Sequence, residues 1–184
     1  MADGQTQESR EQKLVQTEQK PQTYEVGREV FLAKLTEQDR RNLEAAATIF
    51  TDISKEEGLH GGMLIIGGVM EKPFPRKDID IRVVIETGKT RDDHDTYLDY
   101  AKDKFGHLKK ISNRINQEIG TQTVEVLDPG LDEEFQSPSI LKHEGTIKIS
   151  RQGTTPIELL NAIDGNMDGI IARERRPFCV LVRT

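Results

Sequence analysis

The stretch MLIIGGVMEKPFPRKDIDIRVVIE, from Met63 to Glu86, decides the fold class. It holds a short apolar run, a Gly-Gly pair, a basic loop punctuated by proline, and two aspartates that alternate with aliphatic residues. This alternation predicts a strand over Asp78–Glu86, with four aliphatic residues on one face and both aspartates on the other. Because aspartate is depleted in strands, its presence at two positions calls for a reason.

Asp78 and Asp80 share one face of that strand, so their carboxylates stand side by side. Such a pair suits a hard divalent cation such as Mg²⁺, which takes one or two carboxylates together with phosphate oxygens. Upstream, the predicted strand Met63–Ile66 ends in Gly67 and Gly68, where the backbone can turn sharply and its N–H groups can face phosphate oxygens. The sequence therefore predicts a cleft in which a cation and an anionic phosphate meet.

This combination of Gly-Gly after one strand and Asp-x-Asp at the start of the next resembles the nucleotidyltransferase superfamily related to DNA polymerase beta. That superfamily includes the CCA-adding enzymes and the minimal antibiotic nucleotidyltransferases. The resemblance covers about Leu43–Leu127 and implies an α+β fold in which helices flank a mixed sheet. It also implies that Gly67 and Gly68 hold a nucleoside triphosphate, and that Asp78 and Asp80 bind a pair of Mg²⁺ or Mn²⁺ ions.

The resemblance further implies a third acid on a neighbouring strand, which would bind metal and take part in catalysis. Glu125 fits, because it lies between two valines in the predicted strand Thr121–Leu127. Asp128, just beyond that strand, is the competing candidate. Three basic residues could balance the charge of the triphosphate: Lys72, Arg76 and Arg82.

The function implied is metal-dependent transfer of a nucleoside monophosphate from a nucleoside triphosphate to a hydroxyl acceptor that the sequence does not identify. Val69 departs from the pattern, since many members carry Ser or another polar residue after the second glycine. Two alternatives stay open. One is an inactive nucleotidyltransferase-like domain that acts as a binding or regulatory module, and the other is an unrelated α+β domain whose acids bind Ca²⁺.

Composition limits the other functional classes. The chain has 184 residues and a formal net charge of -6, and the acidic balance argues against extensive nucleic-acid binding unless a local basic stripe overrides it. Cys179 is the only cysteine, so no intramolecular disulfide can form. The polar N-terminus and the absence of a long apolar run predict a cytoplasmic protein with neither a signal peptide nor a membrane span.

The polar segment 1–24 contains few aliphatic residues and is expected to be a disordered tail, with docking of a protein partner as the alternative. Residues 25–184 are expected to form one domain. Within it, helical spacing predicts a helix from a Thr36 cap to Gly58, with Asp39 in the capping-box position, and a second over Asp93–Ile119.

Further elements are expected near the C-terminus. Alternating residues predict a strand over Thr146–Ser150, and the apolar run Phe178–Val182 predicts a buried strand. Thr155-Pro156 opens a predicted short helix that runs through Ile163.

Three polar clusters have simpler explanations than a binding site. The acids of Asp92–Asp95 favour helix capping over metal binding, and His143 with Glu144 favours a surface loop over acid-base chemistry. A basic group before the last strand favours a solvated turn over phosphate binding: Arg173, Arg175 and Arg176.

Overall fold

A computed structural model describes residues 24–72, 77–120, 123–128, 145–150, 152–162 and 165–184. The predicted tail, apart from Tyr24, lies outside these residues, as do Arg76, His143 and Glu144. Within the described ranges, no helix is both long enough and apolar enough to cross a membrane.

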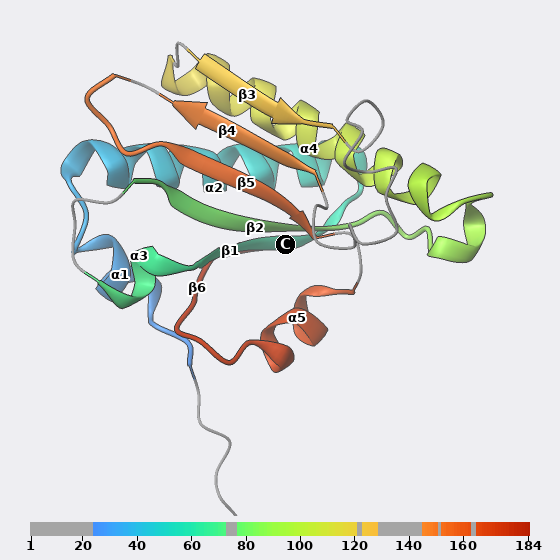
Figure 1. Cartoon of the computed structure of the whole chain (residues 1–184), viewed down its shortest axis with the longest axis horizontal. Helices are drawn as coiled ribbons and strands as arrows, with labels where there is room; N and C mark the ends of the chain where they lie inside the picture. Colours follow the sequence, from blue (N-terminus) through green and yellow to red (C-terminus); the bar gives the residue numbers. More distant parts are fainter. Residues whose placement is uncertain (1–23, 73–76, 121–122, 129–144, 151, 163–164) are drawn as a thin grey trace, which may run out of the picture.

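A mixed β-sheet forms the centre of the protein (Figure 1), which confirms the predicted α+β class. Its spatial order is β3-β4-β5-β2-β1-β6. The strands β2 and β5 pair in parallel, and every other neighbouring pair is antiparallel. The strand bounds are β1 His60–Ile66, β2 Ile79–Glu86, β3 Thr123–Leu127, β4 Thr146–Ser150, β5 Ile157–Ala162 and β6 Cys179–Arg183.

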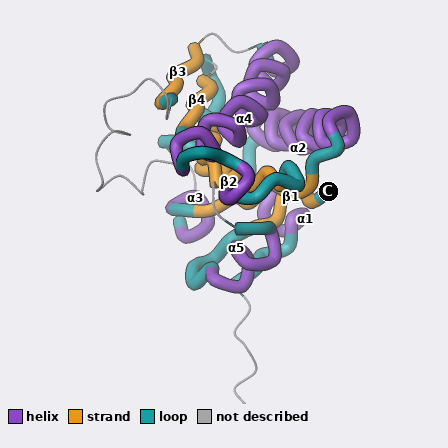
Figure 2. Tube along the Cα trace, turned by 90° about the vertical axis from the view of Figure 1, so that its right-hand side faces the viewer, coloured by secondary structure: helices purple, strands orange, loops and turns teal. Residues whose placement is uncertain are grey.

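Two long helices, α2 and α4, cover one face of this sheet, and the short helix α5 packs on the other (Figure 2). The short helices α1 and α3 lie near one end of β1 (Figure 1). The helix bounds are α1 Arg28–Leu32, α2 Glu37–Glu57, α3 Gly68–Glu71, α4 Tyr97–Ile119 and α5 Met167–Arg173.

Helix α2 begins and ends where its sequence predicts. The Thr36 hydroxyl accepts a hydrogen bond from the Asp39 N–H at 3.1 Å, which satisfies one of the unpaired donors of the first turn. Gly58 ends the helix in the left-handed conformation, with φ 67°. The carboxylate of Asp39 reaches the loop before β5, where it accepts hydrogen bonds from the N–H and hydroxyl of Thr155 at 2.9 and 3.0 Å.

Helix α4 begins later than predicted, at Tyr97 instead of Asp93. Thr96 caps it by accepting a hydrogen bond from the Asp99 N–H at 3.1 Å. Asp93 belongs to a separate 3-10 turn, in which it accepts hydrogen bonds from both the N–H and the hydroxyl of Thr90. Asp93 therefore has a capping role, although it caps a different turn from the one expected.

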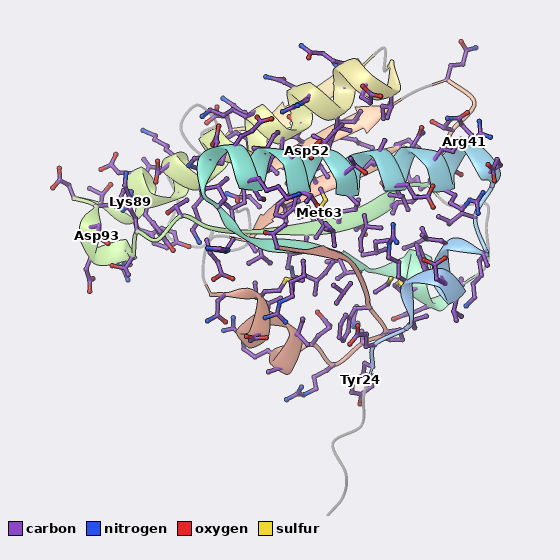
Figure 3. All side chains as sticks on the ribbon, turned by 180° about the vertical axis from the view of Figure 1, so that it is seen from behind. Tyr24, Arg41, Asp52, Met63, Lys89 and Asp93 are labelled. Carbon is purple, nitrogen blue, oxygen red and sulfur yellow. The ribbon has the colours of Figure 1, made fainter. Side chains whose placement is uncertain are left out.

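The alternation in β1 and β2 divides the core between the two faces. Met63 lies beneath the long helices (Figure 3), and four residues of β2 are buried in the same cluster: Ile79, Ile81, Val83 and Ile85. On the opposite face, Leu64 and Val84 pack with Met167 and Ile170 of α5. Both faces of these central strands are thus covered where α5 packs. On the α5 face of β2, the polar residues Asp80 and Arg82 lie nearer the start of the strand than Val84 does.

The helix predicted from Pro156 is wrong, because Ile157–Ala162 of this segment forms the strand β5. Ile157 and Leu159 are buried under the long helices while Glu158 between them faces the other way, as in a strand. Pro156 has no N–H to donate, but its carbonyl accepts a hydrogen bond from the Ile79 N–H at 2.8 Å. Pairing with β2 therefore determines the conformation of a segment whose proline also suits a helix start.

Candidate metal centre

Three carboxylates meet where β2 and β5 begin. Asp78 directly precedes β2, Asp80 is its second residue, and Glu158 is the second residue of β5. Asp80 and Glu158 are partners in the parallel register, so their side chains lie on the same face. One ligand oxygen from each of these three residues lies within 4.8 Å of the others, so the cluster could hold a metal ion.

The glycine turn after β1 lies against this cluster. Ile66 pairs with Asp80 across the antiparallel β1–β2 ladder, which places Gly67 just beyond the pair. Gly67 has φ 76° and ψ -160°, a conformation essentially restricted to glycine. A Cβ atom there would lie 2.5 Å from Asp80 Oδ2. The absent side chain therefore leaves room for the Asp80 carboxylate. Gly68, the other predicted glycine, begins α3.

Glu125 does not lie on the strand next to Asp80, so the expected position of the third acid is wrong. Its strand β3 is at the sheet edge, and β4 and β5 separate it from β2. The register runs from Glu125 to Lys148, Glu158 and Asp80. At about 4.8 Å per strand, the backbone of Glu125 is roughly 14 Å from that of Asp80. Glu158 occupies the adjacent position that the sequence interpretation gave to Glu125.

The competing acid, Asp128, lies away from the cluster as well. Its carboxylate pairs with the Lys109 ammonium of α4, on the face of the sheet that the long helices cover. Asp128 therefore stabilises the packing of α4 and is no substitute for Glu158.

One ammonium group partly balances the three acids. Lys148 of β4 donates a hydrogen bond from Nζ to Asp78 Oδ2 at 3.0 Å, and both side chains are about a quarter exposed, at 27% and 25%. Burial raises the pKa of Asp80, the charge of Asp78 raises it further, and Lys148 opposes the shift. Three carboxylates beside one ammonium leave an excess of acidic groups in the cluster.

Of the predicted phosphate-binding basic residues, Arg82 pairs with an acid outside the cluster. Arg82 lies on the carboxylate face of β2, but its Nη1 is 3.6 Å from Glu174 Oε2, beyond the end of α5. Lys72 follows α3 and is exposed, and Arg76 lies outside the described residues. Lys148, which the sequence interpretation did not single out, is in direct contact with the acid cluster.

The basic group before β6 takes part in local hydrogen bonds. Arg173 Nε donates to the Gly169 carbonyl at 3.0 Å, and Arg175 Nη1 donates to the Ala172 carbonyl at 2.7 Å. These cations cap carbonyl groups at the end of α5, a favourable place for positive charge. The contacts agree with the interpretation of a solvated turn.

The chemistry of the cluster fits a divalent cation. All three groups offer carboxylate oxygens, the hard donors that Mg²⁺, Mn²⁺ and Ca²⁺ prefer. The Lys148 ammonium already places one cation against Asp78, which shows that positive charge is accommodated there.

We expect Gly67→Ala to disturb the cluster. The new methyl group would collide with the Asp80 carboxylate, in addition to a backbone strain of about 1–3 kcal/mol. Gly88→Ala is the matched control, because Gly88 has the same φ of 76° but nothing within 4 Å of an added Cβ. Mn²⁺ titration of both variants should show weakened binding for Gly67→Ala alone. Equal affinities would mean that Gly67 does not shape the site.

Comparison with known proteins adds no relative: no family model matches the chain, and neither a curated protein nor a solved structure matches it. The functional argument therefore rests on the residues and their geometry.

Proposed function

We propose that this protein is a metal-dependent nucleotidyltransferase, which moves a nucleoside monophosphate from a nucleoside triphosphate to a hydroxyl acceptor. The observation that carries the proposal is the convergence of Asp78, Asp80 and Glu158 beside the Gly67 turn. An Asp-x-Asp pair, an acid on the adjacent strand and a glycine turn are the parts that the superfamily resemblance calls for. Here they come from three separate segments of the chain and meet at one place.

Each part has a distinct role in this proposal. The three carboxylates would hold Mg²⁺ or Mn²⁺, which would supply neutralisation of phosphate charge and activation of the acceptor hydroxyl. The glycine turn allows a phosphate group to approach the backbone next to Asp80 without a side chain in the way. Lys148 provides a positive charge in direct contact with Asp78.

The reaction itself is a displacement at phosphorus. The acceptor oxygen forms a bond to the α-phosphorus, the bond from that phosphorus to the bridging oxygen breaks, and pyrophosphate leaves. The hydroxyl proton passes to a carboxylate of the cluster or to solvent. The chain contributes by holding the triphosphate and the hydroxyl in line, which lowers the entropic part of the barrier.

A second candidate function is a non-catalytic module that binds a nucleotide or a partner protein. The ion pair between Lys148 and Asp78 favours it, because part of the acid cluster is neutralised without a metal. Val69 favours it too: the residue that replaces the polar group common in the superfamily is buried in the core beneath the helices. A structural Ca²⁺ site is the corresponding alternative for the cation.

Label transfer would distinguish catalysis from binding. The four nucleoside triphosphates, each labelled at the α-phosphate, are incubated with cell-extract fractions, Mg²⁺ or Mn²⁺, and either wild-type protein or Asp78→Asn. We expect an extract component to acquire label, with release of pyrophosphate, only with wild-type protein and only with a divalent cation. Nucleotide binding without transfer from any fraction would favour the non-catalytic module. The absence of both would contradict the proposed function.

A further inference from the structure

We propose that Lys148 is a built-in counter-cation of the acid cluster: it competes with a free divalent cation for Asp78 and favours the cation that arrives with a polyphosphate. This inference rests on the proposed function, since it concerns the same site. It assigns a specificity-determining role to a residue outside the superfamily pattern.

The position of Lys148 supports this role. It lies on β4, where its register partner is Glu158, and its side chain crosses to Asp78 at the start of β2. The strand β5 lies between β4 and β2, so the Lys148 side chain reaches Asp78 across β5. No turn or loop has to move for the ammonium to leave, because a lysine side chain has four rotatable carbon-carbon bonds.

Charge explains the competition. Three ionised carboxylates and one ammonium carry a formal charge of -2. A divalent cation that binds Asp78 meets the Lys148 ammonium at close range, so the two positive charges repel each other or the ammonium must give up its carboxylate. Either way, Lys148 weakens the binding of a cation that arrives alone.

Charge also explains the preference for a cation with a polyphosphate. The released ammonium remains on the same face of the sheet as the acids, where phosphate oxygens would give it a new anionic partner. A cation-polyphosphate complex therefore brings an anionic group that can replace the Asp78 contact, whereas a bare cation brings none. The lysine would make occupation by the substrate complex more favourable relative to occupation by the free ion.

The test compares two ligands on the full-length chain. Binding of Mn²⁺ alone is measured by electron paramagnetic resonance, and binding of the preformed complex of Mn²⁺ with inorganic triphosphate by thermal shift. We expect Lys148→Met to bind Mn²⁺ alone about tenfold more tightly than wild type, which is about 1.4 kcal/mol. The affinity for the complex should stay the same or fall.

Two further variants serve as controls. Lys148→Arg keeps the positive charge and should bind free Mn²⁺ as weakly as wild type. Lys110→Met removes an ammonium that pairs with Glu57 at 2.8 Å between the long helices. Like Lys148→Met, it deletes one positive charge and one ion pair, but away from the site. Its Mn²⁺ affinity should be unchanged. Circular dichroism of each apo variant establishes that the fold is retained.

The outcomes separate this inference from the proposed function. If wild type binds Mn²⁺ through Asp80 but Lys148→Met binds it equally or more weakly, the role of Lys148 is contradicted and the metal site stands. If Lys148→Met gains Mn²⁺ binding that Asp80→Asn removes, the competition is supported even where wild-type affinity is too low to measure. If neither protein binds Mn²⁺, both ideas fail.

Discussion

Asp80→Asn is expected to abolish divalent-cation binding and nucleotidyl transfer while leaving the apo protein as stable as wild type or more stable. Asp80 is the acid that both the Gly67 turn and Glu158 adjoin, so it lies at the centre of the cluster. Loss of a direct ligand should weaken cation binding by more than about 100-fold. Substitution of a residue that only hydrogen-bonds to a metal ligand already lowers metal affinity by about 10–100-fold. Titration with Mn²⁺ and apo thermal melts measure the two effects.

The stability effect should depend on pH with a defined sign. Because burial and the charge of Asp78 raise the pKa of Asp80, the folded protein binds a proton there more tightly than the unfolded chain does. The contribution of Asp80 to the stability of the wild-type protein is therefore greatest at low pH and is lost as pH rises through the raised pKa. Asn carries no charge, so the advantage of Asp80→Asn should be present at neutral pH and vanish below about pH 4.

Asp168→Asn is the control for this substitution, because Asp168 pairs with Arg183 on the surface and is 77% exposed. It should change neither cation binding nor the pH profile appreciably. A structural role for Asp80 predicts the opposite result: a marked fall in the apo melting temperature with cation binding retained.

Local chemistry explains which elements the sequence predicts well. The Thr36 cap, the Gly58 end and the apolar stripe between them each act within a few residues, and together they specify α2. The same holds for β2, whose period-two alternation identifies both its buried face and its carboxylate face. In these segments the local pattern and the tertiary environment favour the same conformation.

Glu158 could not be recognised in the same way, because the local pattern of β5 is ambiguous. Proline suits the first turn of a helix and also the residue before a strand, and a short apolar run fits either period. Glu158 lies between Ile157 and Leu159, the same acid-between-aliphatics pattern that pointed to Glu125. That signal was present, but its meaning depends on the parallel pairing of β5 with β2.

Strand order is the second feature that the sequence leaves undetermined. The strand after β2 along the chain is β3, yet β3 lies at the edge and β5 takes the place beside β2. Contacts such as that of Asp39 with Thr155, 116 residues apart, depend on the same long-range arrangement. The local sequence of one segment does not indicate which distant segment it pairs with. The identity of the third acid therefore depends on the strand order, which the sequence pattern does not specify.

The identity of that third acid gives the sharpest mutational contrast. Glu158→Gln should remove cation binding and transfer, whereas Glu125→Gln should leave both close to wild type. The reason is distance: Glu158 is the register partner of Asp80, and the backbone of Glu125 lies roughly 14 Å from it across two intervening strands. Each change replaces a carboxylate by an amide of the same shape, so the pair differs in position alone.

Mn²⁺ affinity is the primary measurement for this pair, with label transfer as the second. Asp128→Asn completes the set: it breaks the contact with Lys109 and should lower thermal stability without changing cation affinity, because that carboxylate serves α4. If Glu125→Gln abolished cation binding and Glu158→Gln did not, the third ligand would have to come from β3, and the arrangement of β5 beside Asp80 would not be the functional one. If Glu158→Gln alone removes binding, the site is built where β2 and β5 begin, and the parallel pairing of these two strands is the structural basis of the function.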